Sequence, residues 1–345
     1  MYHDIRLRHG FGVSSLNKRI TNSGKIPVID ISALSRSASA RAAVVTEVGE
    51  ACRDVGFLTI TGARVDARLV ENMRRVVEDV FAVDEQIKRS QAITRDNYRG
   101  YIPMGLFRAN GTDALPDQYE GYKLHQETAF DDPIRRDCQL YGPNRWPAQV
   151  PDGRDVILAY WSEMDRIAFE LLGALEQYLA LAPGVISGCF DKPLTNMTLL
   201  HYPPQEPTTV SCGVHPHKDT DALTIIARDP IGGLEVKCRN GGWVTPNCPE
   251  NGFVVNIGDM LELWSGGRLV STPHRVVNIC GKHRYSFPYF AVPRHDVMVE
   301  PLLPALPGFS RPAVDCGYWS KEIWRTNWPD EAATASTPAL GTLPN

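Results

Sequence analysis

The chain is 345 residues long, enough for one large domain or two and for a substantial apolar core. Its hydrophobic content of 43% and charged content of 22% are ordinary for a soluble globular protein. A formal net charge of −4 gives no support for binding to nucleic acids or anionic membranes, which usually attract basic patches. No apolar run approaches the roughly 20 residues of a membrane-spanning helix. Neither a nucleic acid nor a membrane is therefore an expected partner.

The eight cysteines are scattered along the chain, and no two form a Cys-x-x-Cys pair. The first residues, MYHDIRLRHGFGV, lack the apolar core of a secretory signal. We therefore expect reduced, mostly buried thiols and a cytoplasmic protein. The oligomeric state stays open, and a monomer is compatible with the sequence.

The N-terminal part alternates strands and helices after a polar extension over residues 1–24 that lacks clear periodicity. The run IPVIDIS predicts a strand, and Ser39 is a suitable N-cap for a helix over 40–53. A second strand is expected over 56–61. Asp66 is another candidate N-cap, because the apolar residues after it recur at the spacing of one helix face.

The middle and C-terminal parts have different patterns. Residues 91–155 are rich in Pro, Gly, Asn and Asp, which predicts long loops of the kind that tend to be functional. A long helix is expected over 155–181. From residue 197 onward, short β runs broken by turn residues indicate an all-β barrel or sandwich. The Ala/Thr/Pro-rich residues 330–345 predict a disordered tail.

Two histidines and one aspartate in the β half indicate a metal site. His217 and Asp219 stand two residues apart in HPHKD, and residues i and i+2 of a strand point to the same face, roughly 6–7 Å apart. His274 in STPHRVV begins another apolar run, so it can supply a third ligand from across a barrel. Two histidines and a carboxylate are the ligands of non-haem Fe(II) oxygenases, which keep coordination positions open.

A candidate carboxylate anchor follows ten residues later. Arg284 and Ser286 in RYS repeat the i, i+2 arrangement. A guanidinium offers a bidentate fork to a carboxylate, and the serine adds a hydroxyl donor from the same face. An open metal site beside such an anchor indicates metal-dependent oxidation assisted by an organic acid.

The stretch GVHPHKDTDALTIIARDPIGGLEV, followed by GGWV, VVNIGDMLELWSGGRLVSTPHRVV and RYSFPYFAVP, resembles the isopenicillin N synthase-like family of Fe(II)/2-oxoglutarate dioxygenases. IPVIDISAL and RDVGFLTITGARVD resemble the opening strand–helix–strand region of the same family. The resemblance runs from about residue 25 to about residue 330. Its C-terminal block is highly specific, because the ligands, the anchor and the intervening glycines occur in order.

The resemblance implies an α+β, mainly β fold with a double-stranded β-helix (jelly roll) core. The implied organisation is an extension over 1–24, an N-terminal α/β region over 25–196 whose helices pack on the barrel, the jelly-roll core over 197–329, and the tail over 330–345. The resemblance also implies an enzyme with a role in secondary metabolism.

The resemblance also implies a mechanism. Fe(II) would bind His217, Asp219 and His274, and 2-oxoglutarate would chelate the metal while its far carboxylate rests on Arg284 and Ser286. O2 would convert the co-substrate to succinate and CO2, coupled to hydroxylation, desaturation or ring closure of a substrate. Tyr202 in LLHYPP matches a family position that often reaches co-substrate or substrate, and a buried structural tyrosine is an equally good interpretation.

Other interpretations of these residues remain open. His215 stands two residues before His217 as in a cupin, but Asp221 and Ala222 occupy the positions where a cupin has glutamate. A closed zinc site is disfavoured, since no cysteine stands at ligand spacing. Some relatives keep the triad and the Arg-x-Ser pair without using 2-oxoglutarate. An oxidase of that kind and a non-catalytic small-molecule sensor are therefore the alternatives.

Segments that cover the mouth of the barrel are expected to select the substrate. The candidates are residues 97–107, the region of Phe130, and residues 318–328. Tyr101, Phe107 and Phe130 are the predicted substrate-binding residues, and Arg99 and Arg108 are suited to meeting an acidic group. The prediction is a small, partly apolar metabolite that is a free molecule rather than a protein or nucleic acid.

Overall fold

The computed structural model describes residues 25–107, 116–205, 212–278, 281–326 and 328. The predicted extension over 1–24 and the predicted tail over 330–345 lie outside these ranges. Among the helices of the described part, none combines the length and the apolar character needed to cross a membrane.

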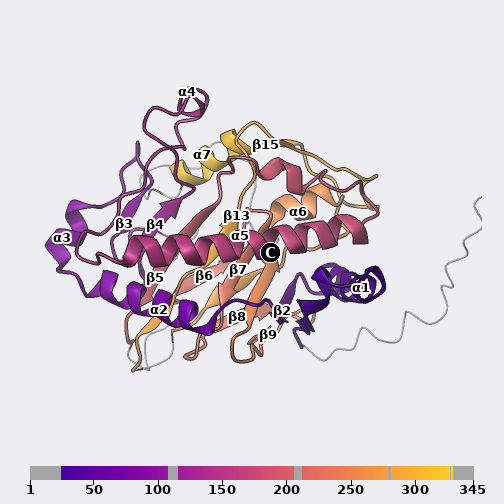
Figure 1. Cartoon of the computed structure of the whole chain (residues 1–345), viewed down its shortest axis with the longest axis horizontal. Coiled ribbons are helices and arrows are strands. Elements are labelled where there is room, and N and C mark those ends of the chain that lie inside the picture. The colour runs from indigo at the N-terminus through magenta and orange to yellow at the C-terminus, as the bar shows by residue number, and fades with distance from the viewer. Residues whose placement is uncertain (1–24, 108–115, 206–211, 279–280, 327, 329–345) are drawn as a thin grey trace, which may run out of the picture.

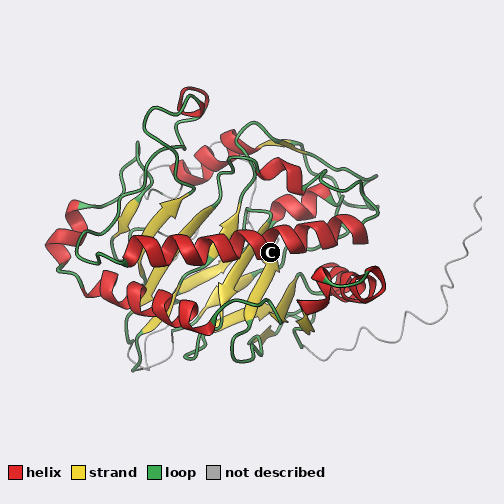
Figure 2. Ribbon diagram, viewed as in Figure 1, coloured by secondary structure: helices red, strands yellow, loops and turns green. Residues whose placement is uncertain are grey.

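Two β-sheets form the centre of the molecule (Figure 2). The larger, nine-stranded sheet has the order β1-β2-β10-β7-β13-β5-β4-β3, with β12 also paired to β5. The smaller sheet has the order β6-β11-β8-β9. All described pairs in these sheets are antiparallel except β1 with β2.

The strands of the larger sheet are β1 (Val28–Asp30), β2 (Phe57–Thr61), β3 (Gly100–Ile102), β4 (Glu120–His125), β5 (Asn196–Tyr202), β7 (Leu223–Ala227), β10 (Phe253–Ile257), β12 (Arg284–Ser286) and β13 (Tyr289–Ala291). Those of the smaller sheet are β6 (Val214–His217), β8 (Leu234–Lys237), β9 (Trp243–Val244) and β11 (His274–Val276). A separate pair joins β14 (Met298–Val299) to β15 (Val314–Asp315). From β6 to β12 the chain passes back and forth between the two sheets, which is the topology of a jelly roll. The predicted fold class is confirmed.

Helices cover the outer face of the larger sheet (Figure 1). α5 (Gly153–Tyr178) runs across the sheet with α2 (Ala67–Ala82) beside it, and α1 (Ala38–Asp54) contacts α5 nearer its other end. The contact between α5 and the larger sheet is aromatic in part, since the rings of Trp161 in α5 and Tyr289 in β13 lie 5.9 Å apart. Burying each large apolar side chain here stabilises the fold by roughly 1.5–3 kcal/mol. The remaining helices are α3 (Glu85–Ser90), α4 (Ile134–Asp137), α6 (Asp259–Trp264), α7 (Cys316–Thr326) and the 3₁₀ turns Ile31–Ser35 and Ser187–Phe190.

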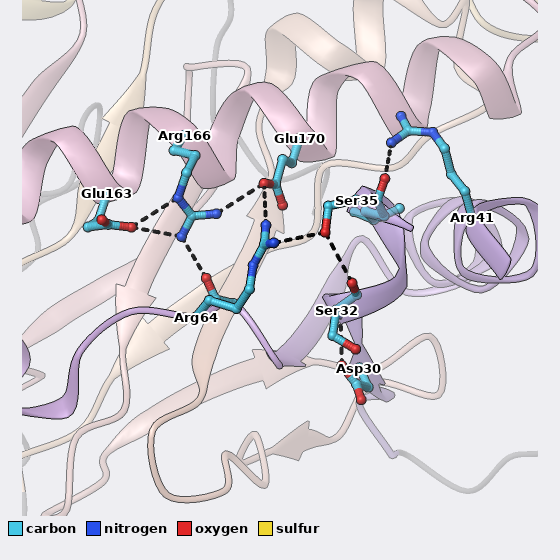
Figure 3. Close-up of polar contacts among 10 residues, drawn as sticks. Asp30, Ser32, Ser35, Arg41, Arg64, Glu163, Arg166 and Glu170 are labelled. Atoms are coloured by element: carbon cyan, nitrogen blue, oxygen red, sulfur yellow. Dashed lines mark hydrogen bonds and ion pairs between the residues drawn. The ribbon is translucent and has the colours of Figure 1, made fainter. Parts of the chain in front are cut away.

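A polar network fastens α5 to the N-terminal strands (Figure 3). Glu170 in α5 accepts hydrogen bonds from Arg166 at 3.1 Å and from Arg64 at 2.9 Å. Arg64 also donates to the hydroxyl of Ser35 at 2.8 Å, and Arg166 donates to the carbonyl of Ala63 at 2.6 Å. These bonds tie the loop after β2 to the helix and so help to fix the edge of the larger sheet.

The structure agrees with some predicted helix limits and corrects others. Asp66 caps α2 by accepting a hydrogen bond from the backbone N–H of Arg68 at 2.9 Å, as predicted. The prediction of Ser39 as the cap of α1 is wrong, because the helix begins at Ala38 and Ser37 occupies the cap position. The predicted loop region over 91–155 contains β3, β4 and α4, and its two strands form the far edge of the larger sheet.

Candidate active site

The three predicted metal ligands meet where β6 and β11 pair. His217 in β6 and His274 in β11 are direct partners across the two strands. Asp219 lies just beyond the end of β6, and one donor atom from each of the three residues lies within 4.8 Å of the others. The Nε2 atoms of His217 and His274 are each 3.6 Å from Oδ1 of Asp219. The structure therefore brings the three side chains together at one point.

Backbone carbonyls orient both imidazoles. Nδ1 of His217 lies 2.8 Å from the carbonyl oxygen of His215, and Nδ1 of His274 lies 3.3 Å from that of Thr272. When Nδ1 carries the proton and donates it to a carbonyl, Nε2 keeps its lone pair for a metal. Each ring is thus fixed in the tautomer that a metal ligand needs.

Neighbouring side chains hold the second oxygen of Asp219. Its Oδ2 accepts hydrogen bonds from the Thr224 hydroxyl at 2.5 Å and from the Asn256 amide at 2.7 Å. These bonds leave Oδ1 to face the two imidazoles. The sequence prediction did not include Thr224 or Asn256, whose roles depend on the pairing of β7 with β10, where they are partners.

The electrostatics of the triad suit a cation. Burial opposes ionisation of Asp219, but the two imidazoles and the Thr224 hydroxyl hold its pKa below the usual range. Burial lowers the pKa of His274 to about 4, so this ring is neutral near pH 7. Two imidazoles and one carboxylate form a facial set that suits Fe(II) and leaves positions open. These residues fit the implied metal.

One ligand marks the open side of the site. The side chain of His217 is 37% exposed, whereas those of Asp219 and His274 are 7% and 6% exposed. The His274 ring also packs edge-on against Phe57, with centroids 5.3 Å apart. Access from solvent is therefore on the His217 side.

Arg284 lies buried in β12, only 2% exposed. Its Nε donates to the carbonyl of Gly232 at 2.7 Å and lies 2.5 Å from a carboxylate oxygen of Asp229. Its Nη1 is buried without a hydrogen-bond partner in the described part of the chain. A buried donor left unpaired costs free energy, so this atom fits the carboxylate of the implied 2-oxoglutarate.

Glycine is required where the chain passes Arg284. Gly233 has φ of +93°, and a Cβ there would stand 2.4 Å from the carbonyl oxygen of Val277. Asp229, four residues before this glycine, was also missing from the sequence prediction. The Asp-Pro-Ile-Gly-Gly turn signal places it near a chain reversal but does not show that it pairs with Arg284.

Ser286 and Tyr202 lie beside Arg284. Ser286 is buried two residues along β12, on the same face. Tyr202 in β5 is the strand partner of Arg284, and the guanidinium carbon lies 4.6 Å from the centroid of its ring. Burial raises the pKa of Tyr202 to about 12, so its hydroxyl stays protonated. The tyrosine forms a wall of the anchor site.

His215 has a partner of its own. Its Nδ1 lies 2.7 Å from a carboxylate oxygen of Asp117, which also accepts from its backbone N–H at 3.0 Å. It does not join the group of metal donors found in the described residues. This arrangement gives no support to a cupin-like site.

The structure separates the three predicted substrate-binding residues. Tyr101 is paired with Tyr122, so it points to the outer face of the sheet, and its hydroxyl donates to Glu120 at 2.7 Å. Phe130 is 78% exposed in the loop before α4, with the guanidinium carbon of Arg135 4.6 Å from its ring centroid. Neither position supports the predicted contact with substrate.

Phe107 has a different position. It is buried in an apolar cluster with Ile93, Tyr98 and Ile102, against which Tyr119 packs. Tyr119 also packs on the cluster that contains Tyr202. Phe107 therefore remains a candidate for the substrate side of the site. Arg99 is buried and donates to the carbonyl of Leu140 at 2.6 Å, and Arg108 lies outside the described residues.

Comparisons with known proteins give a consistent result. A family model described as the non-haem dioxygenase in morphine synthesis N-terminal region matches residues 26–149, and the model of the 2OG-Fe(II) oxygenase superfamily matches residues 194–293. The chain is 30% identical over 299 residues to a probable iron/ascorbate oxidoreductase of Dictyostelium discoideum, covering 78% of this chain and 81% of the relative. It is 30% identical over 269 residues to the 2-oxoglutarate-dependent dioxygenase thnC of Trichoderma harzianum, covering 76% and 82%.

A solved structure has the same fold. A full-length Neurospora crassa protein, in complex with alpha-KG and thymine, superposes with a TM-score of 0.77 at 23% identity, covering 88% of this chain and 98% of that one. The sequence matches extend through both halves of the chain, including the segments that carry the triad and Arg284. This chain belongs to the 2-oxoglutarate–Fe(II) oxygenase superfamily and is an Fe(II)- and 2-oxoglutarate-dependent dioxygenase.

Proposed function

We propose that this dioxygenase oxidises a small, partly apolar metabolite, taken up as a free molecule, by hydroxylation, desaturation or ring closure. The observation that carries the proposal is the aromatic wall that continues from Phe107 through Tyr119 to Tyr202. The rings of Tyr119 and Tyr202 lie 5.9 Å apart, and Tyr202 stands against Arg284. An apolar wall beside a few placed polar groups is typical of small-molecule sites.

Two further points support a free small molecule. The Neurospora crassa structure of the same fold holds thymine, which is a small molecule. The formal net charge of −4 does not favour nucleic acid as a substrate. Within the superfamily, the order of motifs in the C-terminal block favours an isopenicillin N synthase-like enzyme, with a role in secondary metabolism.

Each part of the site has one task in this proposal. Nε2 of His217, Nε2 of His274 and Oδ1 of Asp219 hold the metal, and Thr224 and Asn256 keep that carboxylate in place. The unpaired Nη1 of Arg284 binds the far carboxylate of the co-substrate. When bound there, Fe(II) and 2-oxoglutarate together supply the activation of O2.

The test is a screen of succinate release. Protein reconstituted with Fe(II) under anaerobic conditions is given 2-oxoglutarate, O2 and a panel of metabolites, and succinate and oxidised products are measured. We expect one class of metabolite to raise succinate release in proportion to its own oxidation. Oxidation of a metabolite without succinate would identify an oxidase of this fold instead, and binding without turnover would identify a sensor.

Variants of the triad give the matched control. His217→Ala, Asp219→Ala and His274→Ala should each abolish turnover while leaving the far-UV circular dichroism spectrum unchanged, because each removes one of three protein ligands. His295 lies outside the triad and contacts the hydroxyl of Tyr141, so His295→Ala should keep its iron and its turnover. Retained iron binding and activity in His274→Ala would contradict the assignment.

A further inference from the structure

A lysine stands on the inner face of the larger sheet, on the same side as the metal ligands. Lys123 is partly buried, whereas the other residues of β4 are fully buried. Its Nζ donates to Oδ1 of Asn196 at 2.6 Å and to the Thr198 hydroxyl at 2.9 Å, both in β5. Nζ also lies 5.1 Å from the ring centroid of Phe290 in β13. Its immediate surroundings are therefore neutral groups.

The strand register places this lysine relative to the metal site. Asn256, Thr224, Phe290 and Asn196 are successive partners across β10, β7, β13 and β5, so their side chains form one row on one face. The row begins with the two residues that hold Asp219 and ends with the residue that holds Lys123. Lys123 is thus part of the same inner surface as the metal site.

The positive charge on Lys123 has no close counter-charge in the described part of the protein. No carboxylate of these residues lies within ion-pair distance of Nζ. An ammonium has three N–H donors, and only two have partners among the residues that the structure describes. Burial lowers the pKa of Lys123 to about 7, against the attraction of Asp221 and Asp219. An incoming carboxylate would supply the missing counter-charge and favour the charged form of the lysine.

We propose that Lys123, held in place by Asn196 and Thr198, binds a carboxylate of the substrate, so that the enzyme selects acidic small molecules. This inference rests on the proposed function and adds a substrate class to it. The third N–H of Lys123 is the donor available to the incoming carboxylate. Phe290 and the aromatic wall described above contact the apolar remainder of the substrate.

The test compares acids with their own amides. Protein loaded with Mn(II) and 2-oxoglutarate, in which Mn(II) replaces Fe(II) to prevent turnover, is titrated with propionate, phenylacetate and cinnamate and with the three corresponding primary amides. Binding is measured by calorimetry and by the rise in Tm. At least one acid should bind ~10–100-fold more tightly than its amide, as expected for a charge-assisted hydrogen bond. Lys123→Met should remove that difference, and Lys123→Arg should restore part of it.

Two measurements keep the outcomes distinct. Lys25, an exposed lysine at the start of the described chain, provides the control variant Lys25→Met, which should keep the acid–amide difference. The affinity for 2-oxoglutarate is measured in the same samples before any acid is added. If no acid outbinds its amide in the parent protein, or if the difference survives in Lys123→Met, the inference is wrong.

Loss of 2-oxoglutarate affinity in Lys123→Met, with the acid–amide difference intact, would instead make Lys123 a contact of the co-substrate. Failure of the proposed function has another signature, because no metabolite of the panel would then raise succinate release in the parent protein. The acid–amide comparison can still be made in that case on the Mn(II)-loaded protein.

Discussion

At the scale of single residues, the hydrogen bonds to Oδ2 of Asp219 determine how well Oδ1 is placed to bind a metal. The Thr224 hydroxyl donates its one proton to Oδ2 of Asp219, and a carboxyl oxygen of Asp221 lies 2.9 Å from the same hydroxyl. Burial and the neighbouring Asp219 raise the pKa of Asp221 well above its usual range. The Thr224 hydroxyl thus connects two buried carboxyl groups, only one of which faces the imidazoles.

Removing this hydroxyl should weaken metal binding without removing a ligand. We expect Thr224→Val, which keeps the shape of the side chain, to lower the affinity for Fe(II) by roughly 10–100-fold, as is typical for residues that orient metal ligands. Anaerobic titration with Fe(II) measures the effect. Thr46→Val, at a threonine on the exposed side of α1, is the matched control. Unchanged iron affinity in Thr224→Val would show that Asn256 alone orients the carboxylate.

Substitutions of Arg284 should show whether binding of 2-oxoglutarate needs the two-donor guanidinium or only a positive charge. Arg284→Lys keeps the positive charge but loses the unpaired Nη1 donor, so we expect the KM for 2-oxoglutarate to rise by about 10-fold or more, with Arg284→Ala worse. The alanine variant also leaves the buried Asp229 without its cation, which should destabilise the fold by about 3 kcal/mol. Succinate release at varied 2-oxoglutarate gives the first value, and urea unfolding gives the second. An unchanged dependence on 2-oxoglutarate in Arg284→Lys would contradict the assigned role.

The sequence predicts the residues of the site that share one strand or one short motif. Arg284 and Ser286 stand two residues apart within β12, and this spacing gives them a common direction. Asp219 follows the end of β6 at His217, so the short motif predicts its role but the expected strand alternation does not apply to it. Thr224, Asn256, Asp229 and Lys123 could not be found in the same way. Each acts through a partner on another strand, so its role depends on a register that the local sequence does not contain.

At the scale of elements, β4 shows why a strand was missed. Its outward residues are Glu120, Tyr122 and Leu124, and its inward residues are Gly121, Lys123 and His125. Both faces mix polar and apolar side chains, so the period-two alternation that identifies a strand is absent. The polar groups are tolerated because each finds a partner, Glu120 on the outer face and Lys123 on the inner face. The same strand therefore contributes to stability on one side and, in our proposal, to substrate binding on the other.

The outer face of β4 carries a buried ionic network. Glu120 accepts from Lys88 of α3 and from Tyr101 of β3, each at 2.7 Å, and its other oxygen lies 2.7 Å from Nδ1 of His201 in β5. Burial opposes its ionisation, but the bonds from His201, Lys88 and Tyr101 prevail and lower the pKa of Glu120 to about 2. This carboxylate links three elements.

We expect Glu120→Gln to destabilise the protein by about 3 kcal/mol at pH 7, because it removes the buried anion of Lys88 and leaves only the exposed Glu85, 3.3 Å away. The folded-state pKa lies below the usual 4.5, so the contribution is present above pH 4.5 and is lost as the pH falls toward 2. The difference in unfolding free energy between parent and variant should therefore shrink by on the order of 2 kcal/mol from pH 6 to pH 3. Urea unfolding at both pH values measures this difference.

The control is Glu163→Gln, which breaks a more exposed pair with Arg166 and should cost under about 1 kcal/mol at either pH. A difference that is constant with pH would contradict the role of Glu120.

At the scale of the whole molecule, the larger sheet joins segments that are distant in sequence. β10 lies between β2 from the N-terminal region and β7 from the jelly roll. The fold class was predictable, because short β runs and an ordered set of motifs are local features. The continuation of the sheet into β1, β2, β3 and β4 was not, since pairing between distant strands depends on tertiary packing, such as that of α1 on β1 and β2, rather than on local pattern.

This organisation predicts how ligands stabilise the whole protein. The three proposed metal ligands come from β6 and β11 of the smaller sheet and the loop after β6, whereas Arg284 comes from β12 of the larger sheet. A metal and a co-substrate that chelates it would therefore link the two sheets, and both bind only the folded chain. At a ligand concentration 100 times Kd the gain is about 2.7 kcal/mol, which for a chain of this size raises Tm by roughly 4 °C.

We expect Mn(II) alone to raise Tm and 2-oxoglutarate to raise it further only when the metal is present. Asp219→Ala should lose both increments, whereas Arg284→Lys should keep the first and lose most of the second. Differential scanning calorimetry of the three proteins, with and without each ligand, gives the four values needed for each. Equal increases in Tm from 2-oxoglutarate with and without metal would mean that the co-substrate binds away from the triad, which would contradict a shared site.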